Sequence, residues 1–297
     1  MTALIGIDWG TTSFRAWRMG PGSEVLDQVA DGPGILAAGA LPGGFAQALQ
    51  DRIGGWLDGA PVIASGMITS RNGWVETPYL PLPLDAAALA DSLTLHDGIH
   101  FVTGAVSDPD GPAPDVMRGE ETEIIGHLAG GGGDGLFVLP GTHSKWARAE
   151  GGRLTAFRTV MTGEVFAALR DHTILGRLIP PGLTVPEPGG EDAFRRGVQA
   201  GRQGGALLGR IFSARTLALM DRLPPGRIAD YLSGLLIGDE VAHGMRDAAG
   251  PVTIIGRGDL AARYRLALAE TGIAAAIAPP GMARRGLWEI ARLRGLA

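Results

Sequence analysis

Residues 3–19 read ALIGIDWGTTSFRAWRM. The apolar run up to Asp8 predicts a buried strand, residues 10–13 predict a turn, and Phe14–Met19 predicts the second strand of a hairpin. The first strand delivers an acid at its end, and the turn offers a glycine backbone and hydroxyl groups to an anion. A carboxylate beside such a turn favours a hard cation that bridges acid and anion, for which Mg²⁺ is the natural choice. The alternative interpretation is an ordinary hairpin turn.

A second segment follows the same plan in the middle of the chain. Leu136–Leu139 predicts a strand, residues 140–142 (PGT) a turn, and Ser144–Arg148 with Leu154–Phe157 a hairpin. Leu139–Trp146 therefore combines a strand end, hydroxyl groups and a cation, in a pattern that also suits a solvated hairpin turn.

Two further patterns lie outside these turns. A helix predicted over Gly119–Leu128 begins with Arg118-Gly119-Glu120-Glu121-Thr122, and acids in a first turn also serve simple capping through the helix dipole. Val252–Ile255 predicts a strand that enters a turn at Gly256–Gly258 and then a helix. This glycine pattern lacks a Rossmann fingerprint.

The rest of the chain completes an α/β pattern. Strands are predicted over residues 25–29, 61–68, 100–106 and 273–278, loops over 70–84 and 176–190, and helices over 42–56, 86–93, 163–171, 191–203, 204–220, 228–248, 260–271 and 283–296. Strands and hairpins open the chain, a helix crosses near the middle, and a second strand–turn–strand unit repeats the opening. The order predicts a two-fold repeated α/β design with mixed sheets.

Composition excludes several classes of protein. The 297 residues are 45% hydrophobic and 19% charged, with a net charge of −5 and no basic run, which argues against nucleic-acid binding. No apolar run approaches the length of a membrane span, and the N-terminus shows no secretory signal. The absence of cysteine excludes disulfides and thiolate metal sites and favours a reducing cytoplasm. The six histidines show no pair with the spacing of a zinc site.

The two phosphate-type turns, the acid-bearing helix between them and the late glycine turn together resemble the actin-like ATPase fold of sugar kinases and Hsp70. Gly119-Glu120-Glu121 stands where carbohydrate kinases of the glycerol-kinase type have Gly-Asp-Gln. Most of the chain resembles the 2-dehydro-3-deoxygalactonokinase family more closely. The matching stretches are residues 7–12, 66–68, 70–71, 73–76, 117–122, 139–146, 161–164, 212–216 and 231–238.

The resemblance implies two duplicated actin-like ATPase (ribonuclease-H-like) domains, with mixed sheets flanked by helices and a cleft between the domains. We expect residues 1–117 to form the sugar-acid and phosphate side and residues 118–281 the nucleotide side, with a helix over 282–297 that packs back on the N-terminal domain. It also implies an ATP- and Mg²⁺-dependent kinase that phosphorylates 2-dehydro-3-deoxy-D-galactonate to its 6-phosphate. The partner would be a small sugar acid, and the sequence leaves the oligomeric state open, a homodimer included.

The resemblance also implies roles for the turns and for the central helix. Asp8 would hold Mg²⁺ through water, residues 10–12 (Gly10, Thr11, Thr12) would cradle the transferring phosphate, and Gly141 and Thr142 would bind the β/γ side. Glu120 aligns with the usual catalytic Asp that accepts the proton of the attacking hydroxyl. Because Glu reaches one methylene further, Glu121 is the alternative base, and we favour Glu120.

The substrate carboxylate needs a cation, and Arg71, Arg118 and Lys145 are candidates. Arg suits a planar carboxylate because its guanidinium binds both oxygens. We place Arg71 first, because it lies in the loop where this fold usually builds its sugar pocket. Trp74 would pack a face of the sugar chain or lie buried under the loop, and Lys145 would meet ATP phosphate or stay on the surface.

Glycines late in the chain are candidates for the adenosine side. Gly256 and Gly258 would flank the adenosine, whereas Gly234, four residues before Gly238 on one helix face, fits either a nucleotide contact or tight helix packing. The sequence assigns no role to Arg215.

Two other functions remain open at this stage. One is a kinase of another sugar acid or sugar, because pocket geometry sets the choice of substrate. The other is an actin- or chaperone-like ATPase switch that uses the same turns and acts through binding partners. Whether ATP consumption requires a sugar acid separates these classes.

Overall fold

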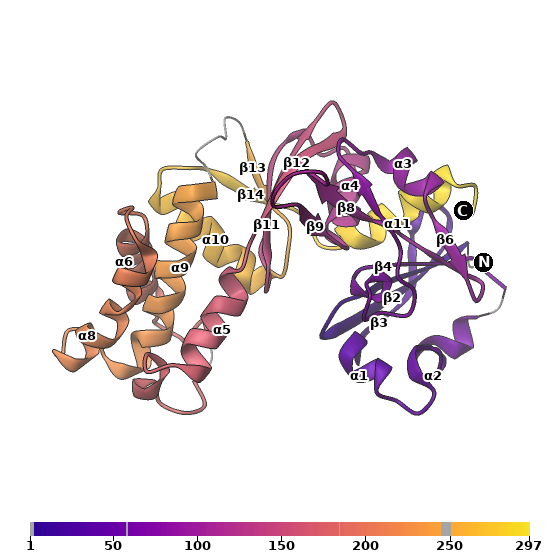
Figure 1. Ribbon diagram of the computed structural model, residues 1–297. Coiled ribbons are helices and arrows are strands. Elements are labelled where there is room, and N and C mark those ends of the chain that lie inside the picture. Colours follow the sequence, from indigo (N-terminus) through magenta and orange to yellow (C-terminus); the bar gives the residue numbers. More distant parts are fainter. Residues whose placement is uncertain (1–2, 58, 184, 245–250) are drawn as a thin grey trace. The chain divides into compact units, whose positions relative to one another are not determined.

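The computed structural model describes residues 3–57, 59–183, 185–244 and 251–297 (Figure 1). The chain forms two compact units. Unit 1 comprises Met1–Asp134, Ala147–Arg158 and Pro279–Ala297, and unit 2 comprises Gly135–Trp146 and Thr159–Ala278. The border between the units passes within two strands, β11 (Ser144–Glu150) and β12 (Arg153–Val160).

Unit 1 is built on a six-stranded mixed sheet. In spatial order its strands are β3 (Val25–Pro33), β2 (Ser13–Met19), β1 (Leu4–Trp9), β4 (Val62–Ser65), β7 (Ile99–Phe101) and β6 (Thr94–His96). The hairpin predicted from residues 3–19 is present, with β1 antiparallel to β2 and parallel to β4.

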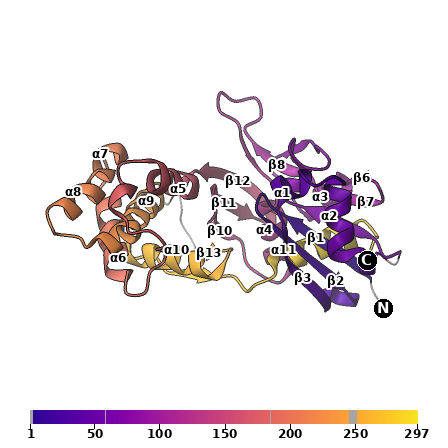
Figure 2. The ribbon, with the colours of Figure 1, turned by 90° about the horizontal axis from the view of Figure 1, so that it is seen from below.

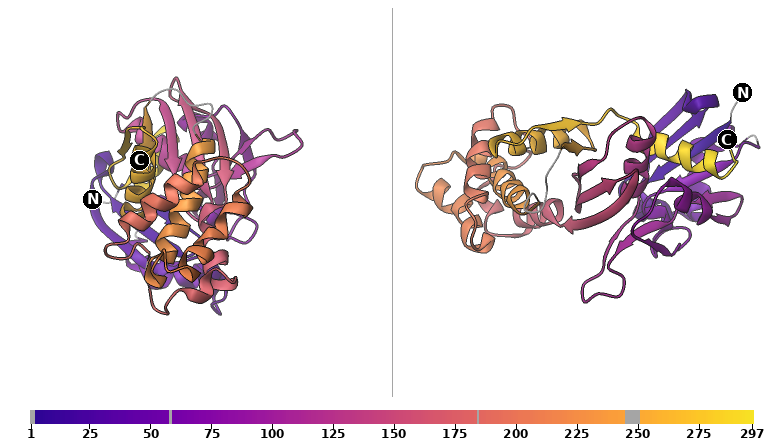
Figure 3. Two further views of the ribbon diagram at one scale, coloured as in Figure 1. Left: turned by 90° about the vertical axis from the view of Figure 1, so that its left-hand side faces the viewer. Right: turned by 90° about the horizontal axis from the view of Figure 1, so that it is seen from above.

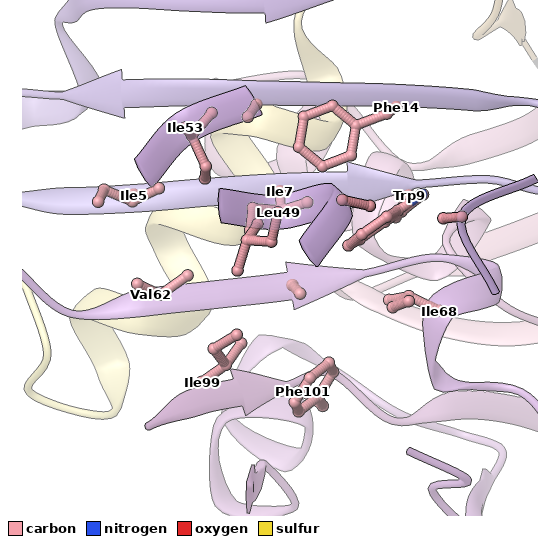
Figure 4. Close-up of a cluster of buried hydrophobic side chains, with 14 of the residues drawn as sticks. Ile5, Ile7, Trp9, Phe14, Leu49, Ile53, Val62, Ile68, Ile99 and Phe101 are labelled. Atoms are coloured by element: carbon pink, nitrogen blue, oxygen red, sulfur yellow. The ribbon is translucent and has the colours of Figure 1, made fainter. Parts of the chain in front are cut away.

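Alternation along β1 sends its side chains to two different layers. Ile5, Ile7 and Trp9 join the core beneath helix α2 (Gly44–Ile53), which contributes Leu49 and Ile53 (Figure 4). On the other face, a Cβ on Gly6 would lie 3.3 Å from Leu287 of helix α11 (Met282–Leu293). Asp8 follows Gly6 by two residues, so its side chain starts on the face of the sheet that α11 covers.

Helix α4 (Glu120–Ala129) lies directly on α11. A Cβ on Gly126 would lie 1.9 Å from the Met282 carbonyl oxygen, and one on Gly286 would lie 1.9 Å from the Thr122 carbonyl oxygen. The two glycines therefore let the helix backbones touch. This contact groups α4 and α11 in one compact unit, whereas the sequence predicts a boundary between residues 117 and 118.

The remaining elements of unit 1 are short. They are helices α1 (Ile35–Gly39) and α3 (Ala86–Asp91), the 3₁₀ helices η1 (Pro21–Ser23), η2 (Gly54–Trp56) and η3 (Met67–Thr69), and a sheet of β5 (Tyr79–Pro81), β8 (Gly104–Ser107) and β9 (Asp115–Met117). The single strand predicted over residues 100–106 is wrong, because β7 pairs with β4 whereas β8 leaves to pair with β5 and β9. The predicted loop 70–84 contains β5.

Unit 2 contains most of a five-stranded mixed sheet and a layer of helices (Figure 2). The strands in order are β12, β11, β10 (Gly135–Leu139), β13 (Val252–Ile254) and β14 (Ala275–Ile277). The helices are α5 (Thr162–His172), η4 (Gly176–Leu178), α6 (Glu191–Gly201), α7 (Leu207–Ile211), α8 (Ser213–Leu219), η5 (Pro225–Arg227), α9 (Ile228–Gly244) and α10 (Gly258–Glu270). β10 and β13 are parallel, so the turns after them leave the same edge of the sheet.

Helix α9 is the central helix of unit 2, and α6 lies beside it (Figure 3). The predicted helix 204–220 is two helices, α7 and α8. The predicted helix 228–248 is seen to Gly244, and residues 245–248 lie outside the described residues. No helix in the described part of the chain is long and apolar enough to cross a membrane.

Candidate active site

Asp8 lies near the end of β1, where three segments of unit 1 converge. Its direct partner across the hairpin is Arg15 of β2, and on the other side it pairs in register with Ser65 of β4. Gly66, with φ of 95°, follows Ser65, and a Cβ there would lie 3.2 Å from Asp8 Oδ1 and 2.9 Å from the Trp9 carbonyl oxygen. A Cβ on Gly119, just before α4, would lie 3.2 Å from the Cα of Gly66. Glycine at both positions lets the start of α4 approach the carboxylate.

The turn after Asp8 is exposed and tightly supported. The Gly10 amide donates to the Ser13 carbonyl at 2.9 Å, and the Thr11 and Thr12 side chains are open to solvent. Gly34 lies against this turn so closely that a Cβ would be 2.3 Å from the Thr11 carbonyl oxygen. The backbone of the turn is therefore supported by Gly34, whereas its threonine hydroxyl groups stay exposed to solvent.

The turn after β10 in unit 2 repeats this construction. A Cβ on Gly163 would lie 2.3 Å from the Gly141 carbonyl oxygen, and the Glu164 amide donates to the Thr142 carbonyl at 3.0 Å. The imidazole of His143 contacts the Glu164 carboxylate. Both predicted phosphate turns thus have an exposed threonine and a glycine packed against the turn backbone.

Glu121 is buried and bonded to its own end of the helix. Its side chain is 1% exposed and accepts hydrogen bonds from the Gly119 amide at 2.8 and 2.9 Å and from the Thr122 hydroxyl at 3.0 Å. Burial raises the pKa of Glu121 to about 8, and the charge of Glu120 adds to the shift. These contacts fit a capping role, which supports Glu120 as the base.

Glu120 and Glu123 are the other two glutamates at the start of α4. Glu120 is partly exposed and accepts a hydrogen bond from the Arg118 amide at 3.0 Å. Glu123 Oε1 lies 3.7 Å from Nη2 of Arg15, the guanidinium that also pairs with Asp8. Burial raises the pKa of Glu123 to about 8, and the charge of Asp8 adds to the shift whereas Arg15 opposes it. The sequence prediction missed Glu123, although residues three apart share a helix face.

Arg118 is buried and makes structural contacts. Nη1 donates to the Thr69 hydroxyl at 2.9 Å and to the Thr77 hydroxyl at 2.6 Å, and Nη2 donates to the Thr77 carbonyl at 2.6 Å. The guanidinium also lies 4.0 Å from the centre of the Tyr79 ring. Arg118 thereby closes the base of the loop 70–76, so the contacts fit a positioning role more closely than direct substrate binding.

Arg71 and Trp74 lie in that loop with opposite environments. The Arg71 side chain is 85% exposed and pairs with Glu76 at 3.2 Å. Trp74 packs on the unit 1 core, with ring centres 6.2 Å from Phe45 and 6.1 Å from Phe101. Of the three predicted cations, Arg71 is the most exposed, whereas Trp74 has the packing partners of a half-buried core residue.

The predicted nucleotide-side residues of unit 2 differ in their exposure to solvent. Lys145 is 5% exposed within β11, so a surface position is wrong for it. Gly256 and Gly258 are exposed beside the end of β13, and a Cβ on Gly256 would lie 3.4 Å from the Pro140 ring. The turn at residues 256–258 and the turn at residues 140–142 are therefore neighbours.

Gly234 lies in the helix contact between α6 and α9. A Cβ there would be 2.1 Å from the Phe194 carbonyl oxygen, and one on Gly238 would be 2.5 Å from the Val198 carbonyl oxygen. Gly197 and Gly201 of α6 meet α9 in the same way. Helix packing accounts for Gly234 without a nucleotide.

Arg215, for which the sequence offered no role, donates to the Ile174 carbonyl at 3.1 Å. This contact ties α8 to the loop after α5, within unit 2.

A buried polar network lies beside the second turn. Glu240 of α9 accepts from Trp146 Nε1 at 2.7 Å and from the Tyr264 hydroxyl at 2.6 Å, and the Ser144 and Tyr264 hydroxyls are 2.8 Å apart. Burial raises the pKa of Glu240 and of Tyr264. The network fixes the start of β11, which immediately follows the Gly141–Thr142 turn.

The residues present fit magnesium held mainly by water and phosphate. Among residues 3–57, 59–183, 185–244 and 251–297, no group of three or more His, Cys, Asp or Glu side chains could hold a metal ion. Mg²⁺ commonly keeps several waters and uses one or two carboxylates together with substrate phosphates. Asp8, beside an exposed threonine turn, meets that requirement.

Comparison with known proteins identifies the relatives of this chain. It matches the family described as 2-keto-3-deoxy-galactonokinase over residues 8–290. It is 36% identical over 280 residues to the 2-dehydro-3-deoxygalactonokinase of Escherichia coli K12, an alignment that covers 92% of this chain and 91% of that protein. A crystal structure from Sinorhizobium meliloti, assigned as a 2-dehydro-3-deoxygalactonokinase, matches with 34% identity and a TM-score of 0.88 over 97% of this chain and 96% of that one.

More distant structures share the fold alone. Component A of the Acidaminococcus fermentans (R)-2-hydroxyglutaryl-CoA dehydratase matches with 13% identity and a TM-score of 0.55 over 98% of each chain. The expected α/β fold of the actin-like ATPase type, with mixed sheets flanked by helices, is confirmed. The resemblance inferred from the sequence motifs is confirmed as well, and the chain belongs to the 2-keto-3-deoxy-galactonokinase family.

Proposed function

We propose that this protein is an ATP-dependent kinase that phosphorylates 2-dehydro-3-deoxy-D-galactonate to its 6-phosphate. Membership of the 2-keto-3-deoxy-galactonokinase family supports the reaction. The observation that carries the chemistry is the approach of the start of α4, whose first residue is Glu120, to Asp8 and the Gly10–Thr12 turn that follows it. An acid for the metal, a turn for the phosphate and a carboxylate for the attacking hydroxyl are what phosphoryl transfer requires.

In this proposal the protein mostly positions groups and balances charge. Magnesium, held by Asp8 through water, would neutralise charge on the nucleotide phosphates. Residues 10–12 of unit 1 and residues 141–142 of unit 2 would each bind phosphate through exposed threonine hydroxyl groups, and residues 256–258 would line the adenosine side. Glu120 accepts the proton of the substrate hydroxyl as it attacks.

Arg71 is the cation we assign to the substrate carboxylate, because its side chain is exposed at the loop that Arg118 holds in place. Only Glu76 competes for it among the ion pairs described, and a planar carboxylate can replace that partner with two parallel hydrogen bonds. The cysteine-free composition supports work in a reducing compartment such as the cytoplasm.

Identification of the product tests this function. Purified protein incubated with Mg-ATP and 2-dehydro-3-deoxygalactonate should yield a phosphate monoester at C6, seen by ³¹P nuclear magnetic resonance and mass spectrometry. An ester formed only on a neutral sugar would keep the kinase and exclude this substrate. Release of inorganic phosphate alone would contradict the proposed reaction.

A further inference from the structure

Arg15 is shared between two carboxylates that belong to different elements. Its guanidinium pairs with Asp8 on the neighbouring strand, and the same nitrogen, Nη2, lies 3.7 Å from Glu123 Oε1 on α4. The first contact follows from strand register, since Asp8 and Arg15 are direct partners in β1 and β2. The second depends on α4, which α11 holds in place through Gly126 and Gly286.

The three side chains differ in their freedom to move. The Arg15 side chain is 45% exposed, whereas those of Asp8 and Glu123 are 13% and 20% exposed. The carboxylates are thus held by the scaffold, and the long guanidinium side chain is the part that can shift. A movement of about 1 Å would bring Arg15 from ion-pair distance into hydrogen-bonding distance of Glu123.

We propose that Arg15 is the counter-cation of Asp8 in the metal-free protein, and that Glu123 is a positioning residue that receives Arg15 when magnesium binds. The inference rests on the proposed function, because it takes Asp8 as the residue that holds magnesium. A divalent cation and a guanidinium repel each other at Asp8, so the arrival of magnesium favours the departure of Arg15. Glu123 offers the displaced cation a second carboxylate a short distance away.

In this exchange Glu123 affects magnesium binding only through Arg15, and it contacts neither the metal nor the nucleotide. Without the Glu123 charge, Arg15 would lose the second of the two carboxylates that the described residues place within ion-pair distance of it, and would stay on Asp8. The magnesium dependence of nucleotide binding would weaken as a result. Burial and the charge of Asp8 raise the pKa of Glu123 whereas Arg15 lowers it, so a closer approach of Arg15 favours the ionised form that pairs with it.

A double-mutant cycle tests the exchange without measuring turnover. The affinity for ADP is measured by titration calorimetry in EDTA and at rising magnesium concentration, for the wild type, Glu123→Gln, Arg15→Gln and the double variant. We expect Glu123→Gln to reduce the enhancement of ADP affinity by magnesium roughly fivefold, as for weakly coupled sites. In the Arg15→Gln background, Glu123→Gln should have no further effect.

Two controls separate this exchange from general damage. Glu289→Gln removes another carboxylate of unit 1 that pairs with an arginine, at 2.7 Å from Arg292, and should leave the magnesium dependence unchanged. Glu123→Asp keeps the charge with a shorter reach and should give an intermediate loss, which also serves if Glu123→Gln fails to fold.

The proposed exchange would be overturned if Glu123→Gln reduced the magnesium enhancement of ADP affinity equally with and without Arg15. It would also be overturned if Glu123→Gln caused no reduction while Arg15 is present. If the wild type phosphorylates the sugar acid and the cycle is additive, this inference alone fails. If the wild type does not bind ADP at all, the proposed function fails with it.

Discussion

At the scale of single residues, the three glutamates in the first turns of α4 have distinct surroundings. Glu121 is enclosed and bonded to its own backbone, Glu123 lies near Arg15, and Glu120 is partly exposed beside Arg118. Burial and partners, rather than residue type, therefore distinguish these three identical side chains.

Removal of the carboxylate of Glu120 should affect turnover and leave the fold intact. We expect Glu120→Gln to lower kcat by a factor of about 10²–10⁴, the range for a lost general base. Steady-state kinetics and a thermal unfolding curve measure the two effects, with Glu289→Gln as a control. A Glu120→Gln protein that turns over at nearly the wild-type rate would remove Glu120 from the mechanism.

Glu121 should make stability depend on pH. Because its folded pKa of about 8 lies above the usual value of a carboxyl, the folded protein holds a proton that the unfolded chain releases. Its contribution to stability is complete below about pH 4, where the unfolded carboxyl is also protonated, and is lost as the pH rises through 8. Unfolding of the wild type should thus become easier as the pH rises from about 4 to about 8.

Glu121→Gln provides the comparison, because it cannot ionise. Its melting temperature should vary less than that of the wild type over this pH range, as measured by calorimetry. Parallel curves for the two proteins would show that Glu121 does not titrate there.

The positions of Asp8 and of the two turns could be predicted because each lies in a short segment whose residue types alone indicate a strand that ends in a turn. The sequence could not separate Glu120 from Glu121, since that choice depends on which side chain is buried. It missed Glu123 for a similar reason, because the contact of Glu123 with Arg15 depends on how α4 packs beside the strand that carries Arg15.

At the scale of elements, close glycine contacts recur in both units. Gly126 and Gly286 join α4 to α11, and Gly234 and Gly238 join α9 to α6. In each contact a carbonyl oxygen occupies the space that a Cβ would need, so the helix axes come close together. Contacts of this kind fix the position of α4 and hence of its glutamates.

Gly234→Ala separates helix packing from nucleotide binding. The added methyl group would meet the Phe194 carbonyl, so we expect a loss of about 1–3 kcal/mol in the free energy of unfolding from overpacking. The affinity for ADP, measured by calorimetry on the folded protein, should stay unchanged. Weaker ADP binding at an unaltered melting temperature would instead support the adenosine-side role predicted from the sequence.

Most elements could be predicted from apolar periodicity, including the opening hairpin and helices α4, α5, α6, α9 and α10. The small sheet of β5, β8 and β9 could not, because each strand is short and its partners lie far along the chain. Residues 100–106 have the composition of one strand, and only pairing with two different sheets divides them.

At the scale of the whole molecule, the two units share one plan. Each has a strand that ends in an exposed threonine turn, with a glycine backbone packed against the turn, at Gly34 in unit 1 and at Gly163 in unit 2. The sequence predicted this repetition from the order of its elements. The proposed function takes both turns as phosphate-binding turns, one from each unit.

The most direct test of the account is the rate of ADP release by the purified protein with Mg-ATP, measured with and without a panel of sugars. The panel would contain 2-dehydro-3-deoxygalactonate, other 2-keto-3-deoxy sugar acids and neutral sugars. The account predicts slow release without substrate and strong stimulation by the galactonate derivative. A slow rate that no sugar raises would contradict it and would favour an ATPase that works through binding partners.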